Sequence, residues 1–313
     1  MTTTEQPTDS INHWLADGIL LVTAMLWGIN ILVFKSTISD FDPWVFNALR
    51  MVLATFTLGG LALGEAVLWP NRPNRSTTER RRTHWPRVLV FCLMNGFFYL
   101  IIFVKGIELT TAGNTALILA SMPMWTAIIS FLVLSERLPR VTWLGLLVTF
   151  VGTVIVTTQS GGAVSLESQY FLGNLCMLTA SLAWAGGTVL SRPILQTMSP
   201  LRLAFISALL TTPLHILIVA KQLPEAWPQA LEAKNWIAIV YSGIFSTGIA
   251  YATWHAGVRA VGASHASVYQ NVVTLVAVIG GWIFLREKFL YVQLLGGTLT
   301  IAGLLLMRYG RRG

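Results

Sequence analysis

Charged residues are scarce in this chain, and acidic residues are the scarcest. Asp and Glu supply 13 of the 313 residues, and all charged residues together make up 11%. Hydrophobic residues make up 54%, and the mean hydropathy is +0.66. Soluble domains usually carry about 25% charged residues. The composition therefore excludes an ordinary soluble protein and predicts an integral membrane protein.

Cysteines and reactive clusters are also nearly absent. Cys92 and Cys176 both lie in apolar runs, where we expect small hydrophobic packing rather than a disulfide. The sequence shows no paired carboxylates, no metal-spaced histidines and no nucleophile with a base nearby. We therefore expect no catalytic residues, no metal and no cofactor. A membrane-embedded transferase is the least favoured class of function.

The formal net charge of +8 does not indicate nucleic-acid binding, because the basic residues lie mainly in short segments between apolar runs. Most arginines, including the cluster from Arg72 to Arg87, fall on one side if the N-terminus is cytoplasmic. This bias predicts a multi-pass protein of the inner (plasma) membrane with both termini in the cytoplasm. The expected partners are the lipid bilayer and a small-molecule substrate, without nucleic acid, and the expected state is a monomer or weak homodimer.

Ten apolar runs are long enough to cross a hydrocarbon core of about 30 Å. Because lipid offers no water to backbone groups, and because no alternating strand pattern is present, these runs predict helices. The expected spans are 17–35, 43–68, 85–106, 112–134, 141–158, 170–191, 200–221, 235–256, 264–285 and 291–308. An N-terminal tail, residues 1–16, and a basic C-terminal tail, residues 309–313, are expected to flank them.

The two halves of the sequence repeat each other. Trp27 returns 157 residues later as Trp184, and Gly152 returns 151 residues later as Gly303. The expected copies are residues 17–158 and 170–308, joined by an external linker, residues 159–169. Five spans per copy is an odd number, so the second copy must enter the membrane inverted. The predicted fold is an all-α membrane protein of ten helices, built as two inverted five-helix repeats around a central cavity.

The order of the motifs resembles an EamA domain of the drug/metabolite transporter superfamily. The matching motifs are Trp27-Gly28, Lys35, Pro43, Arg50, Pro123, Ser135-Glu136-Arg137-Leu138, Gly145 and Gly152. The second copy is looser, with Ala185 in place of the glycine and Thr274 in place of the proline. The resemblance covers residues 17–308 and implies that spans one to four and six to nine surround the cavity, while five and ten lie outside. It also implies export of amino acids, other metabolites or drugs.

Polar and aromatic side chains inside the spans are the candidates for a solute site, since such groups are costly in lipid unless they face protein or water. Helical spacing places several of them on common faces. The candidate substrate-binding residues are Trp27, Asn30, Asn95, Tyr99, Trp184, Tyr251, Trp254, His255, Gln270 and Asn271. For each aromatic residue, packing between helices is an equally compatible interpretation. Glycines of the fifth and tenth spans, such as Gly152 and Gly303, permit close helix contacts, and we favour packing over a binding role for them.

These features predict a secondary transporter that moves small metabolites out of the cell by alternating access. Amino acids with aromatic or other partly apolar side chains are the expected substrates. A multidrug or organic-cation exporter is the alternative, but it needs an acidic group in the cavity, and no carboxylate lies near the middle of a span. The small multidrug resistance branch differs, since its members depend on a glutamate in the first helix. Arg50 is the only arginine well inside a span; structural pairing is its first interpretation and substrate contact its second.

Overall fold

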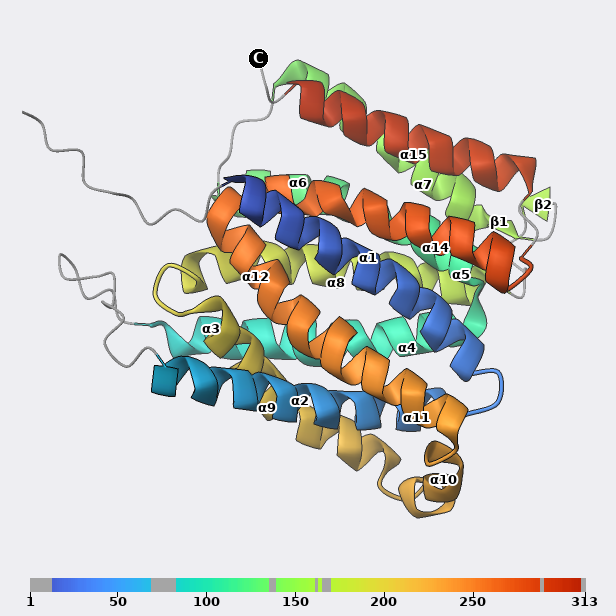
Figure 1. Ribbon diagram of the computed structural model, residues 1–313. Helices are drawn as coiled ribbons and strands as arrows, with labels where there is room; N and C mark the ends of the chain where they lie inside the picture. Colours follow the sequence, from blue (N-terminus) through green and yellow to red (C-terminus); the bar gives the residue numbers. More distant parts are fainter. Residues whose placement is uncertain are drawn as a thin grey trace, which may run out of the picture.

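The computed structural model describes residues 13–68, 83–134, 139–160, 163–164, 170–287 and 290–310. Within this part of the chain the helices form ten rods (Figure 1). They are α1 (His13–Thr37), α2 (Pro43–Leu68), α3–η1–α4 (Trp85–Phe91, Cys92–Phe98, Tyr99–Leu109), α5–α6 (Ala112–Leu119, Met122–Leu134), α7 (Arg140–Thr158), α8 (Phe171–Ile194), α9 (Pro200–Val219), α11–η2–α12 (Ala233–Val240, Tyr241–Ile249, Ala250–Val261), α13–η3–α14 (Ala263–Ala266, Ser267–Tyr269, Gln270–Phe284) and α15 (Tyr291–Gly310). A short helix, α10 (Leu223–Ala230), and a small antiparallel hairpin, β1 (Gln159–Ser160) and β2 (Ala163–Val164), connect them.

The second span of each half begins with a side-chain cap. The Asp42 carboxylate accepts hydrogen bonds from the backbone N–H groups of Trp44 and Val45, 2.9 and 2.8 Å away, at the start of α2. The hydroxyl of Ser199 accepts one from the backbone N–H of Arg202 at the start of α9. Both helices begin on a proline, whose missing N–H costs nothing at that position. The second span of each half therefore begins with the same kind of cap.

Seven of the rods in the described residues are long and apolar enough to cross a membrane. α7 is a shorter apolar helix, and α8 and α15 are not among the seven. Of the ten predicted spans, seven are therefore confirmed by length and composition in the described residues. In α8 the reason is visible in its polar residues, such as Asn174, Ser181 and Thr188, which are buried against other helices. A helix that is largely covered by protein does not need the composition of a lipid-facing one.

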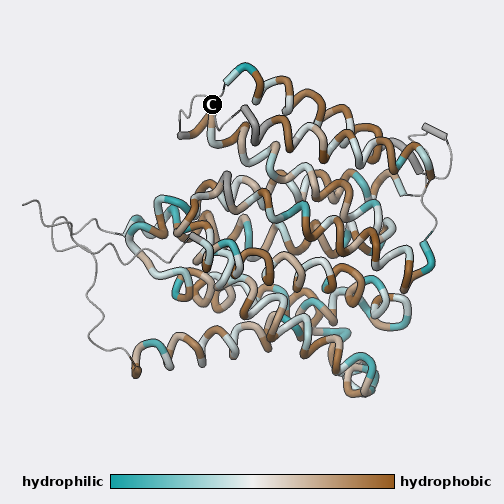
Figure 2. Tube along the Cα trace, turned by 45° about the horizontal axis from the view of Figure 1, so that its top comes forward, coloured by the Kyte–Doolittle hydropathy of each residue, from teal (hydrophilic) through white to brown (hydrophobic). Residues whose placement is uncertain are grey.

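The surface of the rods is apolar, unlike that of a soluble protein. Large apolar side chains stand exposed on the outside of the rods, with Phe56 at 74%, Leu63 at 70% and Trp282 at 66% exposure. Polar side chains such as Asn47 and Asn95 are buried inside. Figure 2 shows hydrophobic residues along the rods and hydrophilic ones mainly near their ends. Because lipid accepts apolar side chains and excludes unpaired polar groups, this is a multi-pass membrane protein.

Several predicted boundaries differ from the structure. α1 begins at His13, within the predicted tail of residues 1–16, and includes the apolar Trp14 and Leu15. The predicted linker 159–169 contains the small hairpin, and α15 continues to Gly310, beyond the predicted end of the last span at 308. Residues 72–82, on which most of the charge argument rests, lie outside the described residues, as do residues 135–138 and 311–313.

The third and eighth rods each contain a π-helical segment, which the sequence did not predict. These are η1 in the third and η2 in the eighth. Adding the repeat offset of 151 to the bounds of η1 gives residues 243–249, which lie inside η2. π-Helical turns are uncommon and frequently mark functional positions in helices. The third and eighth rods, which are equivalent under the repeat, therefore depart from α-helical geometry at the same place.

The contacts between rods repeat when each rod is exchanged for the one five positions along the chain. α2 packs on η2, as α9 packs on η1. α1 packs on α12, as α8 packs on α4. The pairs α2 with α9, and α7 with α15, map onto themselves. The packing thus follows the repeat detected in the sequence.

α7 and α15 pack together along one side of the bundle (Figure 1). A Cβ at Gly152 would stand 2.5 Å from both the carbonyl oxygen of Gly296 and the backbone nitrogen of Thr300. The mirrored contact is equally close, since a Cβ at Gly303 would stand 2.5 Å from the backbone nitrogen of Thr149. The expected tight packing of these glycines is therefore found, on both sides of the repeat.

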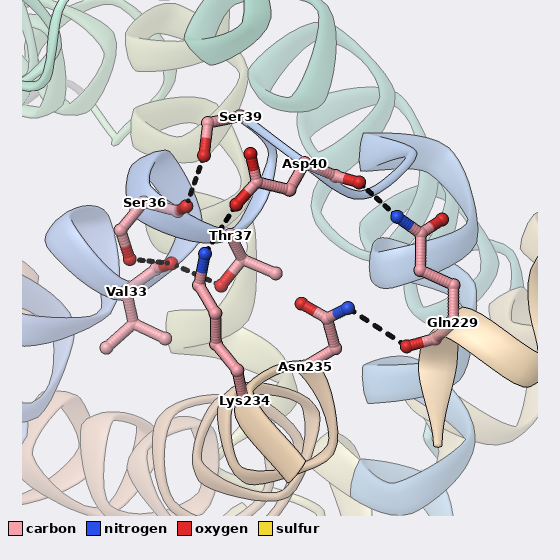
Figure 3. Close-up of polar contacts among 8 residues, drawn as sticks. All are labelled: Val33, Ser36, Thr37, Ser39, Asp40, Gln229, Lys234 and Asn235. Atoms are coloured by element: carbon pink, nitrogen blue, oxygen red, sulfur yellow. Dashed lines mark hydrogen bonds and ion pairs between the residues drawn. The ribbon is translucent and has the colours of Figure 1, made fainter. Parts of the chain in front are cut away.

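The loop between α1 and α2 is tied to the second half of the chain (Figure 3). The Asp40 carboxylate lies 2.5 Å from the Lys234 ammonium, and the Asp40 carbonyl oxygen accepts a hydrogen bond from the side chain of Gln229. Both carboxylate and ammonium are exposed. The hydrogen bond from Lys234, and then its charge, hold the pKa of Asp40 below the ordinary value. An exposed pair of this kind adds little stability, but it connects the two halves at this end.

Candidate functional site

A cavity of about 50 Å³ lies among the central rods. Seven of the ten rods in the described residues contribute to its wall. The lining residues are Trp27, Asn30 and Ile31 of α1, Arg50 of α2, Tyr99, Leu100 and Phe103 of α4, Leu119 of α5, Met122 of α6, Trp184 of α8, Ser246 and Thr247 of η2, Tyr251 of α12, and Gln270 and Val273 of α14. Among the described residues α7 and α15 contribute no lining residue, in agreement with the expectation that spans five and ten lie outside. α9 contributes none either, although the seventh span was expected beside the cavity.

Aromatic rings from both halves form the centre of this wall. Trp184 is the hub: its ring centroid lies 4.9 Å from Tyr99, 5.2 Å from Trp27, 5.5 Å from Tyr251 and 6.0 Å from Trp254. Trp27 also meets Trp254 at 5.1 Å. Most of these pairs are edge-on or tilted, which are favourable ring arrangements. The two tryptophans that first revealed the repeat therefore face each other across the interface of the halves.

Arg50 brings the positive charge to this wall. Its Nε and Nη2 donate to the amide oxygen of Asn47 at 3.1 and 2.8 Å, and Nη1 donates to the hydroxyl of Thr247 at 3.3 Å. Its guanidinium carbon also lies 5.1 Å from the centroid of the Phe34 ring. The side chain is buried, and all of these partners are neutral.

His215 fixes the amide that holds Arg50. Its Nδ1 lies 3.1 Å from the amide nitrogen of Asn47, and its Nε2 lies 2.9 Å from the carbonyl oxygen of Gly96. When Nε2 carries the proton, Nδ1 accepts from Asn47 and both contacts are hydrogen bonds. The Asn47 oxygen is then left to accept from Arg50. The guanidinium is therefore oriented by a chain of neutral groups from three rods.

Six of the ten candidate residues line the cavity: Trp27, Asn30, Tyr99, Trp184, Tyr251 and Gln270. Two of them have a side-chain polar atom that is hydrogen-bonded to another part of the protein. The indole N–H of Trp27 donates to the Ser246 carbonyl oxygen at 2.9 Å, and the Asn30 amide oxygen accepts from the Ser242 hydroxyl at 2.6 Å. Trp254 does not line the cavity but supports its rings from behind. Substrate contact by these residues stays a prediction.

Asn95, His255 and Asn271 are not among the residues that line the cavity. Asn95 packs against Gly187 of α8. The ring of His255 lies 5.4 Å from that of Phe91. Residues adjacent in an α-helix point about 100° apart, so Asn271 cannot share the direction of its neighbour Gln270.

Arg50, for which the sequence left substrate contact as the second interpretation, also lines the cavity, and so does Thr247. A signal was present for Arg50, because an arginine well inside a span is costly unless it serves a site. Thr247 precedes Tyr251 by four residues, a spacing that favours a common helical face. The apolar lining residues, such as Leu100 and Met122, carry no signal that distinguishes them from core residues.

A polar network closes one end of the bundle beside α5. The Glu287 carboxylate accepts hydrogen bonds from the backbone N–H groups of Ala112 and Gly113 at 2.7 and 2.8 Å. This places an anion at the start of α5, where the helix dipole favours it. The Lys35 ammonium donates to the carbonyl oxygens of Ile107 and Thr110 at the end of α4. The network joins the two halves of the chain.

Comparison with known proteins gives a consistent result. The sequence pattern of the EamA-like transporter family matches residues 14–158 and again residues 171–309. An uncharacterized transporter of Bacillus subtilis, YoaV, is 24% identical over 294 residues, covering 92% of this chain and 94% of the relative. An uncharacterized transporter of Methanothermobacter thermautotrophicus is 25% identical over 303 residues, covering 92% and 85%. A WAT1-related chloroplastic protein of Arabidopsis thaliana is 23% identical over 298 residues, covering 93% and 69%.

A solved crystal structure shares the fold, with a TM-score of 0.68 at 20% sequence identity over 95% of this chain and 98% of that one. At this identity the likeness concerns the fold alone. The family pattern, by contrast, covers nearly all of the sequence in two successive matches. The chain belongs to the EamA-like transporter family and is a membrane transporter of small molecules, not an enzyme.

Proposed function

We propose that this transporter moves small, partly apolar metabolites out of the cell, foremost amino acids with aromatic or other apolar side chains. The observation that carries the proposal is the cavity itself, which both halves of the chain build and aromatic rings enclose. Rings of this kind offer large apolar contact with directional preferences. The transporter would export its solute across the inner (plasma) membrane, as the family resemblance favours. The charge pattern favours a topology with both termini in the cytoplasm.

The mechanism we propose is alternating access between two inverted repeats. A cavity of about 50 Å³ holds a few water molecules, whereas a pocket for a drug-sized ligand has roughly 300 Å³ or more. Rods must therefore separate before an aromatic amino acid can enter. The contacts that exchange under the repeat support a rocking motion of one half on the other. The hydrogen bonds of Glu287 to the backbone of Ala112 and Gly113 join the halves at one end, and we expect them to part when that end opens.

An organic-cation exporter is the second candidate, and the charge of the cavity argues against it. Arg50 places a positive group in the wall. No carboxylate from the described residues lines the same space. A cationic solute would meet repulsion without a compensating group.

Counterflow tests the proposal because it needs no assumed energy source. The purified full chain is reconstituted into liposomes loaded with unlabelled solute, and entry of the same labelled solute is followed for phenylalanine, leucine, lysine and tetraethylammonium. We expect transient accumulation of phenylalanine or leucine above protein-free liposomes, and none of tetraethylammonium. Accumulation of the organic cation alone would establish the alternative, and a panel in which no solute moves would contradict the proposal.

A further inference from the structure

We propose that Arg50 binds the carboxylate of the transported solute. The cavity then selects organic anions and zwitterions in which a carboxylate is attached to an apolar or aromatic body. The inference rests on the proposed transport function and adds to it the residue and the ligand chemistry.

The first step concerns the cost of the charge. Arg50 is 3% exposed, and its hydrogen-bond acceptors Asn47 and Thr247 are neutral. Among the described residues no carboxylate forms an ion pair with it. A buried charge without a counter-charge is strongly unfavourable. A protein that retains such a group at the wall of a cavity gains something from it other than stability.

The second step concerns the donors. A guanidinium carries five N–H groups, and three of them are used by Asn47 and Thr247. The remaining two lie one on each terminal nitrogen. The indole N–H of Trp184, in the same wall, is buried and has no acceptor within the described part of the chain. This side of the cavity therefore offers donors and positive charge, which a carboxylate accepts with its two oxygens.

The third step shows that the fold does not require an arginine here. The offset of 157 that relates Trp27 to Trp184 relates Arg50 to Ser207. Ser207 lies in α9, which packs on η1 as α2 packs on η2. The equivalent packing position is thus filled by a small neutral residue in the other half. The scaffold is repeated and the charge is not, so the charge belongs to the site.

The fourth step separates a carboxylate from a phosphate. Phosphate groups carry up to two charges and are usually held by several cationic or backbone donors. Among the described residues that line the cavity, Arg50 is the single cationic side chain. A single guanidinium matches the charge and planar shape of one carboxylate. The aromatic rings beside it suit an apolar body, and their faces also suit an ammonium group.

The test compares ligands that differ only in the carboxylate. Binding of 3-phenylpropionate and of its neutral amide, 3-phenylpropanamide, is measured by titration calorimetry on the full chain in detergent. L-phenylalanine is measured alongside, to distinguish an amino acid from a simple carboxylate as the source of the group. We expect the wild type to prefer both carboxylates over the amide by about tenfold or more, as charge-assisted bidentate contacts do. Equal binding of acid and amide, or no binding of any of the three, would overturn the inference.

Variants locate the preference. Arg50→Gln should reduce the ratio of acid to amide affinity to about one, and Arg50→Lys should keep part of it because the charge remains. Arg259→Gln is the matched control, since Arg259 is exposed at the end of α12, and it should keep the full ratio. A preference that survives Arg50→Gln would contradict the assignment.

A wild-type arm covers the case in which Arg50→Gln does not fold. As the pH falls through the pKa of 3-phenylpropionate, its binding should weaken toward that of the amide, whereas binding of the amide should stay constant. A parallel response of both ligands would overturn the inference. If the protein counterflows phenylalanine but binds acid and amide equally, the proposed transport function stands and the Arg50 site is contradicted. If it prefers the acid but moves no solute, the transport function is contradicted and the site stands.

Discussion

An alanine at residue 152 should destabilise the folded transporter by about 2–3 kcal/mol, as overpacking of a close contact does. The added Cβ would stand 2.5 Å from backbone atoms of Gly296 and Thr300. Backbone atoms of a packed helix cannot move aside as a side chain does, so α7 and α15 must separate. The repeat predicts a similar loss for Gly303→Ala, because that residue makes the mirrored contact.

The measurement is the thermal unfolding of each purified variant in detergent. Gly64→Ala is the matched control, because a Cβ at Gly64 meets nothing within 4 Å. Alanine in an open helical position should stabilise by about 0.5–1 kcal/mol relative to glycine. The two substitutions should therefore shift the unfolding temperature in opposite directions. Shifts of the same sign and size would show that the contact between α7 and α15 does not limit stability.

Tyr99→Ala should lower the transport efficiency, kcat/KM, for the best aromatic or apolar solute by about 30-fold, which corresponds to losing one central contact of about 2 kcal/mol. Tyr99 lines the cavity and its ring packs 4.9 Å from that of Trp184. Removing the ring also enlarges the cavity, so solutes with bulkier side chains should lose least. The order of substrates should therefore change together with the rate.

Asn271→Ala is the comparison for Tyr99→Ala. The sequence alone ranks the two residues together as substrate contacts, whereas the structure places only Tyr99 at the cavity. We expect Asn271→Ala to leave kcat/KM within about twofold of the wild type, as for substitutions away from a site. Initial rates of counterflow for phenylalanine and leucine give the kcat/KM of Tyr99→Ala and of Asn271→Ala. A loss at Asn271 equal to that at Tyr99 would mean that the cavity described above is not where solute binds.

The repeat made the scaffold predictable. Positions that recur at a fixed offset, such as Gly152 with Gly303, do so because both copies must make the same close helix contact, and the structure shows that contact twice. Trp27 and Trp184 recur for a related reason, since each faces the other across the halves. Residues that recur at a fixed offset therefore mark contacts that the two halves make with each other.

The direction of individual side chains was less predictable where a helix departs from the α-helical period. Asn95 and Tyr99 are four residues apart and would share a face in a regular helix. η1 widens the turn between them, and the backbone N–H of Tyr99 bonds to the carbonyl of Met94, five residues back. Asn95 consequently packs on Gly187 while Tyr99 faces the cavity. A local change of helix type leaves no clear trace in hydrophobic spacing.

Arg50 illustrates a third limit. Its position inside a span indicated that something must compensate the charge, but sequence spacing does not show which groups from distant rods meet it. The structure brings Thr247 to it from 197 residues away, and the compensating groups are neutral. Whether a buried arginine is structural or binds a ligand depends on whether its partners in the protein are carboxylates or neutral groups.

The central claim is that solute occupies the aromatic cavity between the two halves. A crystal structure with 4-iodo-L-phenylalanine tests it most directly, because anomalous scattering from iodine locates the ligand independently of the surrounding density. We predict an iodine peak among Trp27, Tyr99 and Trp184, with the carboxylate toward Arg50. A peak outside the bundle, or between rods that do not line this cavity, would contradict the claim.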